Sequence, residues 1–231
     1  MKKIYIADDE ENIRELIAAF LRSEGFETAL FENGDKLLSA FLEAPSDMVI
    51  LDVLMPGTNG LTLCTKLREK SNVPIIIVSA RDSEIDRIAG ITLGSDDYLT
   101  KPFSPMELVA RVKSIFRRIE GPWAQKSGGP LRAGNTQIDP AARSADVGGA
   151  PLELTPTEFA LLTYLFENPE RAVSREELLK NVWKFDFDVD TRATADAVKR
   201  LRKKLHALDS SVRIAPVWGF GFKLEAEHED D

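Results

Sequence analysis

Cysteine and histidine are scarce in this chain of 231 residues, which holds one cysteine and two histidines. A single cysteine leaves no disulfide framework, and Cys64 lies in an apolar helical stripe with Leu63 and Leu67, so we expect it to be a small core residue. Two histidines, His206 and His228, are too few to argue for a transition-metal site.

Long apolar stretches and a phosphate-cradling glycine loop are also missing. No apolar run reaches the length that crosses a bilayer, and Met1-Lys2-Lys3 leads directly into a strand rather than a signal-peptide core. No Gly-x-x-x-x-Gly-Lys segment occurs, which argues against a nucleotide-hydrolysing switch. We therefore expect a cytoplasmic protein with no membrane segment.

Four short apolar runs in the first half each end in a charged or hydroxyl residue. Such runs are typical of strands buried in a parallel sheet, and parallel sheets bind ligands beyond the carboxyl ends of their strands. We therefore expect the polar end residues to lie close together. The runs and their ends are Ile4–Ala7 with Asp8-Asp9, Met48–Leu51 with Asp52, Pro74–Val78 with Ser79, and Tyr98–Thr100 with Lys101.

These end residues suit phosphoryl transfer. Asp8, Asp9 and Asp52 offer hard oxygen ligands for Mg²⁺. Asp52 follows the most apolar run and so lies deepest, and a carboxylate can itself accept a phosphoryl group. Lys101 would pair with that group, and the Ser79 hydroxyl could donate to one of its oxygens. Such a transfer needs mainly positioning and charge neutralisation.

Each of these residues also has an ordinary structural interpretation. Asp9 or Glu10 could cap the helix that begins near Glu11, and a Lys-Pro pair after a strand usually marks only a turn. A serine at such a position is commonly a satisfied hydroxyl or a cap. These interpretations do not explain the joint order and spacing of all four strand ends.

Composition and periodicity divide the chain in two. Strand runs alternate with amphipathic stretches as far as Ile119, which predicts an α/β fold with a doubly wound five-stranded parallel sheet of order 2-1-3-4-5. A Gly-, Pro- and Ser-rich linker follows at 121–130. We expect domains at 1–120 and 131–225 and an acidic tail at 226–231. The predicted helices are Glu11–Glu24, Asp35–Glu43, Asn59–Lys70, Ser83–Leu93 and Pro105–Ile119.

The second half has a different pattern. Residues Leu131–Leu154 contain short alternating segments broken by turn signals, which predict small antiparallel strands. Three helices follow, and a last hairpin is expected to turn near Trp218-Gly219. The helices are Thr157–Glu167 behind Thr155-Pro156, Arg175–Val182 behind Ser174, and about Thr191–Ala207; the hairpin strands are Val212–Ala215 and Phe220–Leu224.

The helix at Thr191–Ala207 is strongly basic. Apolar residues at helical spacing would bury one face and leave the basic side chains exposed, which makes the helix a candidate reader of the DNA major groove. A charge run on a helix can also be only a solvated face. The six basic residues are Arg192, Lys199, Arg200, Arg202, Lys203 and Lys204, against the single acid Asp196.

The formal net charge of −8 argues, taken alone, against a nucleic-acid partner. The second half, however, holds 15 basic and 18 acidic residues, and five of these acids lie in the tail Glu225–Asp231. Without the tail the balance is +2. DNA responds to the local patch within a Debye length of about 8–10 Å, so the total charge does not exclude it.

The first 119 residues resemble the receiver domain of bacterial two-component response regulators. The resemblance implies that Asp52 is the phospho-acceptor, that Asp8 and Asp9 hold Mg²⁺ with the Leu54 carbonyl, that Ser79 and Lys101 contact the phosphoryl group, and that the Lys101–Pro102 bond is cis. It is carried by Ala7-Asp8-Asp9-Glu10, Leu51-Asp52, Met55-Pro56-Gly57 with Gly60, Ser79-Ala80, and Asp96-Asp97-Tyr98-Leu99-Thr100-Lys101-Pro102-Phe103.

The second half resembles the α+β winged-helix effector domain of the OmpR/PhoB family. The segments that match are Leu154-Thr155-Pro156-Thr157-Glu158-Phe159, Ser174-Arg175-Glu176-Glu177-Leu178-Leu179, Val182-Trp183, Arg200-Leu201-Arg202-Lys203-Lys204-Leu205, and Val217-Trp218-Gly219-Phe220-Gly221-Phe222. In that family the third helix enters the major groove and the hairpin wing touches the neighbouring backbone. The implied DNA-binding residues are Arg192, Thr194, Lys199, Arg200, Arg202, Lys203 and Trp218. Ala193-Thr194-Ala195-Asp196-Ala197 replaces the family's usual Thr-Val-Asp-Val-His.

Together the two resemblances imply a transcriptional regulator controlled by phosphorylation. A sensor histidine kinase would phosphorylate Asp52, Ser79 and Lys101 would move inward, and Tyr98 would turn into the vacated space. The family implies a homodimer through residues 83–119, binding to double-stranded promoter DNA, and RNA polymerase as a further partner. Thr92 replaces a usual Glu, which removes a pairing with Lys113. Dimer-surface positions are Arg87, Asp96, Asp97, Glu107, Arg111 and Arg118.

Two rival functions fit parts of the sequence. One is a Mg²⁺-dependent phosphatase or transferase with an Asp nucleophile, but such enzymes commonly carry a second Asp where this chain has Leu54. The other is a receiver joined to a protein-binding module whose basic helix meets an acidic partner. We expect no enzyme activity beyond uptake and slow loss of the phosphoryl group on Asp52.

Overall fold

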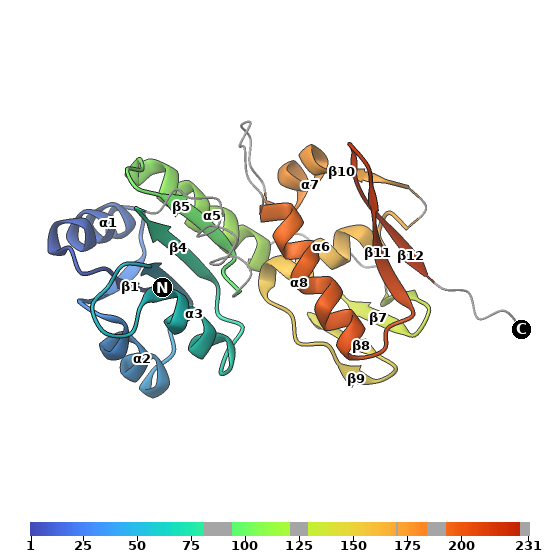
Figure 1. The fold of residues 1–231 in the computed structure, drawn as a ribbon, viewed down its shortest axis with the longest axis horizontal. Coiled ribbons are helices and arrows are strands. Elements are labelled where there is room, and N and C mark those ends of the chain that lie inside the picture. The colour runs from blue at the N-terminus through green and yellow to red at the C-terminus, as the bar shows by residue number, and fades with distance from the viewer. Residues whose placement is uncertain (81–93, 121–128, 170, 184–192, 227–231) are drawn as a thin grey trace, which may run out of the picture. The chain divides into compact units, whose positions relative to one another are not determined.

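The computed structural model describes residues 1–80, 94–120, 129–169, 171–183 and 193–226. The chain forms two compact units, Met1–Lys113 and Ser114–Asp231, which are considered separately (Figure 1). The predicted domain limits stay a prediction, because most of the expected linker lies outside the described residues. Within the described ranges, no helix combines the length and apolar character needed to cross a membrane.

The first unit is built on a five-stranded parallel sheet of order β2-β1-β3-β4-β5, as the sequence predicts. Four of its strands match the predicted apolar runs to within one residue, and the fifth, β2, is an edge strand. The strands are β1 (Lys3–Ala7), β2 (Glu27–Phe31), β3 (Met48–Asp52), β4 (Ile75–Ser79) and β5 (Asp97–Thr100). Every residue of β3 and β4 is buried, as expected for central strands covered on both faces.

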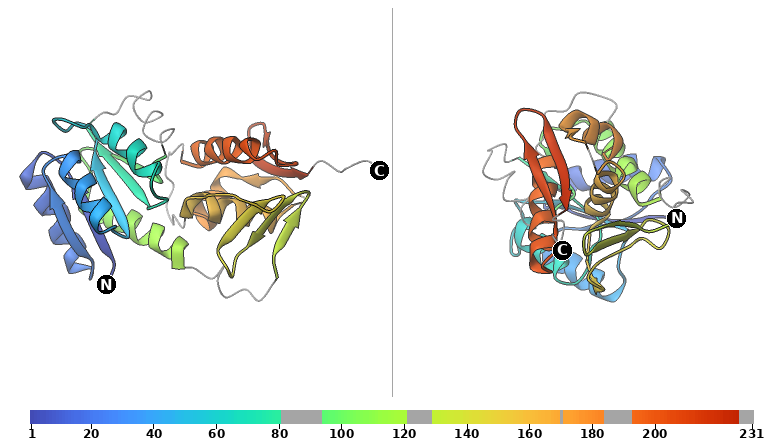
Figure 2. Two further views of the ribbon diagram at one scale, coloured as in Figure 1. Left: turned by 90° about the horizontal axis from the view of Figure 1, so that it is seen from below. Right: turned by 90° about the vertical axis from the view of Figure 1, so that its right-hand side faces the viewer.

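Helices cover both faces of this sheet, with α1 and α5 on one side and α2 and α3 on the other (Figures 1 and 2). The helices are α1 (Glu11–Ser23), α2 (Gly34–Glu43), α3 (Gly60–Arg68) and α5 (Pro105–Glu120). Asn33 and Asn59 cap α2 and α3 by accepting hydrogen bonds from the backbone N–H of Lys36 and Thr62. The predicted helix Ser83–Leu93 lies outside the described residues.

The second unit combines two antiparallel sheets with three helices. A four-stranded sheet of order β6-β7-β8-β9 comes first, and a three-stranded sheet of order β10-β12-β11 ends the unit. The predicted fold class is confirmed. The strands are β6 (Leu131–Ala133), β7 (Thr136–Asp139), β8 (Ser144–Val147), β9 (Ala150–Pro151), β10 (Val173–Ser174), β11 (Val212–Val217) and β12 (Gly221–Ala226).

Three helices are described in this unit. They are α6 (Pro156–Phe166), α7 (Arg175–Asn181) and α8 (Ala193–Ala207). The first two begin within one residue of the positions that the sequence predicts, and the predicted start of the third, Thr191, lies outside the described residues. Thr155 and Glu158 form a reciprocal capping box at the start of α6, and Ser174 caps α7 by accepting from the N–H of Glu177. The core joins residues from all three helices to both sheets and includes the fully buried Trp183.

Candidate functional site

Three carboxylates meet at the carboxyl ends of β1 and β3. Ligand oxygens of Asp8, Asp9 and Asp52 lie within 4.8 Å of one another. Asp8 and Asp52 are buried, whereas Asp9 is exposed. The parallel pairing of Ala7 with Leu51 sets the ends of the two strands side by side. The structure therefore brings together the acidic residues that the sequence places at separate strand ends.

Lys101, which follows β5, reaches into this acidic pocket. Its Nζ lies 2.7 Å from Asp52 Oδ2, 2.8 Å from Asp8 Oδ2 and 3.5 Å from Glu10 Oε1. Burial opposes the charged form of Lys101, but the hydrogen bonds to Asp52 and Asp8 outweigh it and raise the pKa of Lys101 above its usual value. One cation thus serves three carboxylates.

The Asp8 carboxyl is only partly compensated. Burial raises its pKa, and the hydrogen bonds from Lys101 Nζ and from the backbone N–H of Glu10 lower it without cancelling the effect. The neighbouring charge of Asp52 adds to the increase. The pocket therefore carries an excess of negative charge that a divalent cation would relieve.

The position of Asp52 depends on a glycine that the sequence motif contains but that we had not assigned a role. A β-carbon on Gly60 would lie 2.0 Å from the carbonyl oxygen of Asp52, so only glycine lets α3 begin this close to the end of β3. The N–H of Gly60 also donates to the Val53 carbonyl at 3.1 Å. The Asp52 side chain is fixed in turn, because its Oδ1 accepts from the Leu54 N–H at 3.1 Å.

The capping interpretation of the acidic residues before α1 finds little support. The N-cap residue is Glu10, and its side chain makes no capping hydrogen bond. The Asp8 Oδ1 accepts from the Glu10 N–H at 3.0 Å, which shapes the loop after β1. The Asp9 side chain is exposed beside the pocket.

The remaining predicted residues of this pocket lie on the neighbouring strands. Ser79 is fully buried at the end of β4, and its carbonyl accepts from the Lys101 N–H at 2.7 Å. The Lys101–Pro102 bond is cis, which confirms the expectation from the resemblance. Tyr98 is buried and belongs to the same apolar cluster as Val49 and Leu51. Leu54 exposes part of its side chain.

The predicted dimer-surface residues are used in different ways within one chain. Arg111 Nη1 binds Asp97 Oδ2 at 2.9 Å, and its Nη2 binds Glu107 Oε1 at 2.7 Å. Burial opposes the charge of Arg111, but Asp97 and Glu107 outweigh it and raise the Arg111 pKa. Lys113 forms an ion pair with Glu24. These contacts would have to be exchanged or shared if the same groups met a second chain.

Three other dimer-surface predictions need comment. Asp96 is buried, and its Oδ2 accepts from Arg68 Nη2 at 2.8 Å and from the Ile75 N–H at 3.0 Å. These internal bonds correct its assignment to a surface. Arg118, in the last turn of α5, is buried as well: its Nη1 donates to the Thr157 hydroxyl, and its guanidinium lies 5.6 Å from the centre of the Trp183 ring. Arg87, like Thr92, lies outside the described residues.

The basic helix α8 presents a narrower exposed face than its composition suggests. Ala195, Lys199 and Lys203 are exposed at a spacing of four residues, whereas Thr194 is buried at the start of the helix. Arg192 lies outside the described residues. Lys199 and Lys203 therefore form the exposed basic stripe of α8.

Two further basic residues of α8 bind a buried carboxylate that we did not predict as functional. Glu158 is fully buried; Arg200 Nε lies 3.0 Å from its Oε1 and Lys204 Nζ lies 2.7 Å from its Oε2. Burial works against ionisation, but the charges of Lys204 and Arg200 lower the Glu158 pKa below its usual value. Its place in the capping box was the only sequence signal. Arg200, which is predicted to bind DNA, is thus already paired inside the unit, and its contact with DNA stays a prediction.

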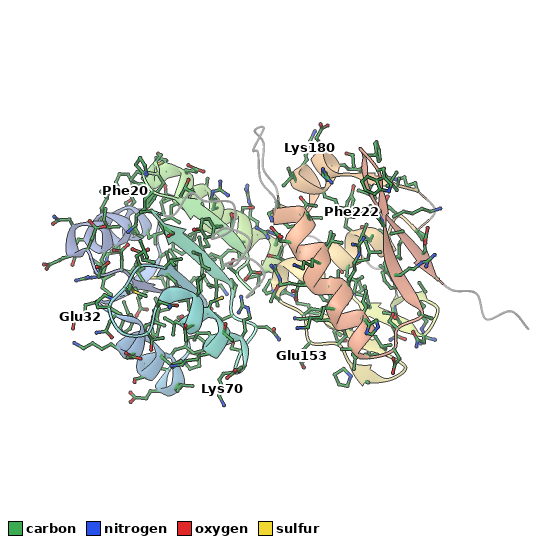
Figure 3. The ribbon with its side chains drawn as sticks, in the orientation of Figure 1. Phe20, Glu32, Lys70, Glu153, Lys180 and Phe222 are labelled. Carbon is green, nitrogen blue, oxygen red and sulfur yellow. The ribbon has the colours of Figure 1, made fainter. Side chains whose placement is uncertain are left out.

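The last hairpin exposes an aromatic residue at its turn. Trp218 is 95% exposed, and Phe220 is 49% exposed. Gly219 has φ +70, which the turn requires and which favours glycine. Arg202 packs beneath the hairpin, with its guanidinium 5.9 Å from the centre of the Phe222 ring, which is labelled in Figure 3. An exposed basic stripe and an exposed hairpin tip thus belong to the same unit.

Comparisons with protein families match both halves of the chain. Residues 4–113 match the response regulator receiver domain, and residues 149–224 match the family described as transcriptional regulatory protein, C terminal. The matched ranges contain the acidic pocket, α8 and most of the last hairpin.

Relatives of known name align over nearly the whole length. The sensory transduction protein RegX3 of Mycobacterium tuberculosis is 40% identical over 97% of this chain and 100% of its own. The transcriptional regulatory protein ResD of Bacillus subtilis is 39% identical over 98% of this chain and 97% of its own. The transcriptional regulatory protein BaeR of Escherichia coli is 40% identical over 97% and 93%.

Solved structures of two-unit proteins also align. A mutant of RitR, 25% identical, superposes with a TM-score of 0.79 over 98% of this chain and 100% of its own. DrrB of Thermotoga maritima, described as an OmpR/PhoB homolog, is 29% identical with a TM-score of 0.51 over 98% and 100%. The likeness extends to both units and to their order along the chain.

Proposed function

Because this chain belongs to the OmpR/PhoB family of two-component response regulators, we propose that Asp52 is the residue on which its phosphorylation occurs. The protein is a phosphorylation-controlled, DNA-binding transcriptional regulator and not a catalytic enzyme. The observation that supports Asp52 is its place in the pocket. Its carboxylate is buried beside Asp8, bonded to Lys101, and fixed by the Leu54 N–H.

Mg²⁺ suits the donor set of this pocket. Carboxylate oxygens are the ligands that Mg²⁺ prefers, and the three carboxylates carry more charge than the one ammonium group, that of Lys101, which bonds to Asp8 and Asp52. Asp8, Asp9 and Asp52, with the carbonyl of Leu54, would hold the ion. When bound, it neutralises charge on the phosphoryl oxygens and on the pocket.

The protein groups around Asp52 would then respond to the new phosphoryl group. Lys101, already 2.7 Å from Asp52 Oδ2, pairs with a phosphoryl oxygen, and the Ser79 hydroxyl donates to another. Charge-assisted hydrogen bonds contribute roughly 1.5–3 kcal/mol each, so two or three of them can shift a two-state equilibrium that needs about 5.5 kcal/mol. Ser79 and Tyr98 form the proposed switch.

A response regulator implies a partner histidine kinase and a DNA target. We propose further that the phosphorylated protein forms a homodimer through residues 83–119, to which Arg87, Asp97, Glu107 and Arg111 contribute charged groups. The internal pairing of Arg111 with Asp97 and Glu107 means that dimerisation exchanges existing ion pairs instead of creating new ones. The expected gain in affinity from each pair is correspondingly small.

For DNA, the exposed groups carry the proposal. Lys199 and Lys203 face outward on α8 and would neutralise phosphates or meet base edges, while Trp218 at the hairpin tip would contact the neighbouring backbone. Arg200 and Arg202 bond within the unit instead, to Glu158 and to the Ile214 carbonyl. We also propose a cytoplasmic location and RNA polymerase as a further partner.

The rival functions lose their basis. A phosphatase or transferase is disfavoured because regulators match the chain over nearly its full length, and a protein-binding effector because residues 149–224 match a transcriptional regulatory domain.

The proposal for Asp52 is tested by phosphorylation with a small phosphodonor. Incubation with Mg²⁺ should add one phosphoryl group, detected by intact-mass spectrometry, and Asp52→Asn should abolish it. Glu43→Gln, an exposed carboxylate of α2, serves as the control and should leave uptake unchanged. Removal of Mg²⁺ by a chelator should prevent uptake. Full phosphorylation of Asp52→Asn would overturn the assignment.

A further inference from the structure

A groove of about 530 Å³ lies between the second half of α8 and β11. Leu205, Val212, Ile214 and Pro216 give it an apolar floor and side, and basic residues stand along it. Strand β11 is an edge strand of the three-stranded sheet. Among the described residues no further strand pairs with its outer side, and this side faces the groove.

One cation in this groove lacks a counter-charge. Arg202 donates from Nε to the Ile214 carbonyl at 2.7 Å, but its Nη2 is buried and has no hydrogen-bond partner among the described residues. Burial lowers the Arg202 pKa, and no carboxylate in the described part of the chain opposes this effect. Arg213, by contrast, is paired with Glu225 at 2.9 Å. An anionic group beside Arg202 would satisfy a buried donor and a buried charge together.

An acidic segment, opposite in charge to Arg202, begins at the end of the groove. The residues after β12 are Glu227-His228-Glu229-Asp230-Asp231, which include four acids. They follow directly on Ala226, whose partner in the β11–β12 ladder is Val212, a residue of the groove. The segment therefore starts beside the groove that contains the unpaired arginine.

The length of the segment is sufficient. Arg202 binds the carbonyl of Ile214, two residues along β11 from Val212, which is about 7 Å at the rise of a strand. Crossing from β12 to the outer side of β11 adds about 5 Å. Five residues span up to about 17 Å when extended, so a carboxylate of the segment can reach Arg202.

We propose that the acidic segment Glu227–Asp231 docks in the groove between α8 and β11, with one of its carboxylates paired to Arg202, and that it competes there with the DNA backbone. The groove supplies apolar contacts and one unmatched cation, and the segment supplies several anions at high effective concentration. The competition would weaken binding to DNA of any sequence, so that only a complex with additional specific contacts displaces the segment.

Docking can be observed without DNA. In the ¹⁵N spectrum of the full chain, the Nε–Hε signal of Arg202 is assigned by its loss in Arg202→Lys. We expect this signal to shift when Glu227→Gln, Glu229→Gln, Asp230→Asn and Asp231→Asn are combined, and to shift alike when the chain is ended at Ala226. A control that neutralises Glu15, Glu43, Glu69 and Glu176, all exposed elsewhere, should leave it in place. An Arg202 signal that stays in place in both tail variants would overturn the docking.

The consequence for DNA rests on the proposed function and is measured separately. With a short mixed-sequence duplex at about 0.1 M salt, the neutralised tail should tighten binding about five- to tenfold, because four anions are removed from the segment that follows directly on β12 of the DNA-binding unit. The control should tighten binding by less than about twofold, because its four acids are spread over both units. Equal gains in both variants would contradict the competition. An Arg202 signal that shifts only when the duplex is added would identify the DNA backbone as the groove's anion and overturn the proposal. Loss of all DNA binding with a persisting tail-dependent shift would instead count against the proposed function.

Discussion

The pocket around Asp52 and the cluster around Glu158 are built from the same kinds of groups in opposite proportion. In the first unit, Lys101 stands among Asp8, Asp52 and Glu10. In the second, Glu158 stands between Arg200 and Lys204. The pKa of Asp8 is raised, mainly by burial, whereas the pKa of Glu158 is lowered, because two cations outweigh its burial.

The difference shows how charge balance separates a reactive site from a structural one. Too few cations leave the Asp52 pocket with negative charge that a divalent ion and a phosphoryl transfer can use. Both Glu158 oxygens accept hydrogen bonds, one from Arg200 and the other from Lys204 and the Thr155 N–H, so the buried carboxylate has no unpaired oxygen. This second cluster fixes the rotation of α8 about its axis and so determines which residues face outward.

The largest expected effect is on stability. Glu158→Gln leaves Arg200 and Lys204 without their counter-charge and should lower the free energy of unfolding of the second unit by about 3 kcal/mol. Urea denaturation measures this loss, and Glu176→Gln, an exposed acid in the first turn of α7, is the control. A loss no larger than that of the control would show that Glu158 has no structural role. The contrast between the Asp52 pocket and the Glu158 cluster would then fail.

The exposed stripe of α8 should matter for DNA instead of stability. Lys199→Ala and Lys203→Ala should each reduce the slope of log K against log salt by about 0.9 and leave unfolding nearly unchanged. At about 0.1 M salt this corresponds to roughly an eightfold loss of affinity for each lysine. Lys70→Ala, on the first unit and labelled in Figure 3, is the matched control. Slopes that stay constant in both α8 variants would show that the stripe does not meet phosphates.

Removing a carboxylate charge from the acidic pocket should change the free energy of unfolding in the opposite direction to Glu158→Gln. In metal-free buffer at neutral pH, Asp8→Asn removes a charge that the folded state holds unfavourably and should raise the free energy of unfolding by about 1 kcal/mol. The same substitution should weaken Mg²⁺ binding, measured by titration calorimetry. Asp47→Asn, a carboxylate remote from the pocket that binds Lys2, should not stabilise. Destabilisation by Asp8→Asn would mean that the pocket is balanced like the Glu158 cluster.

The smallest effect concerns a third charged cluster. Glu177 accepts from Arg171 and from the Tyr164 hydroxyl at 2.6 Å, and the Arg171 hydrogen bond leads in lowering its pKa to about 2. Because the folded pKa lies below the unfolded one, the stability it contributes is present above about pH 4.3 and is lost as the pH falls toward 2. Solvent screens this cluster, so the effect is small. In urea denaturation at a series of pH values, Glu177→Gln should reduce the fall in the free energy of unfolding between about pH 4.3 and 2 by less than about 1 kcal/mol. The same fall in the variant and in the unmodified protein would refute the contribution of Glu177 to stability.

Much of the fold could be predicted because its signals are local. Continuous apolar runs gave β1, β3, β4 and β5, and Thr155-Pro156 marked the start of α6. Parallel strands place their carboxyl ends at one edge, so the acidic pocket also followed. The two-residue strand β10 is too short to leave a periodic pattern, so the sequence does not predict it.

Ion pairs over long separations could not be predicted in the same way. Glu158 and Arg200 are 42 residues apart, and Arg68 and Asp96 are 28 apart, so no spacing rule connects them. A basic residue on a helix looks the same in sequence whether it meets solvent, DNA or a buried carboxylate. The basic residues predicted for this helix therefore overestimated the exposed charge of α8, where Arg200 and Lys204 pair with Glu158.

The central claim is that phosphorylation of Asp52 controls where the second unit binds DNA. The most direct test is a selection of bound DNA fragments from the genome that encodes this protein. The phosphorylated full chain and an identically treated Asp52→Ala variant are compared in parallel. We predict a limited set of fragments that is enriched by the phosphorylated protein and absent or much weaker with Asp52→Ala. Recovery of the same fragments in equal yield by both proteins would contradict the account.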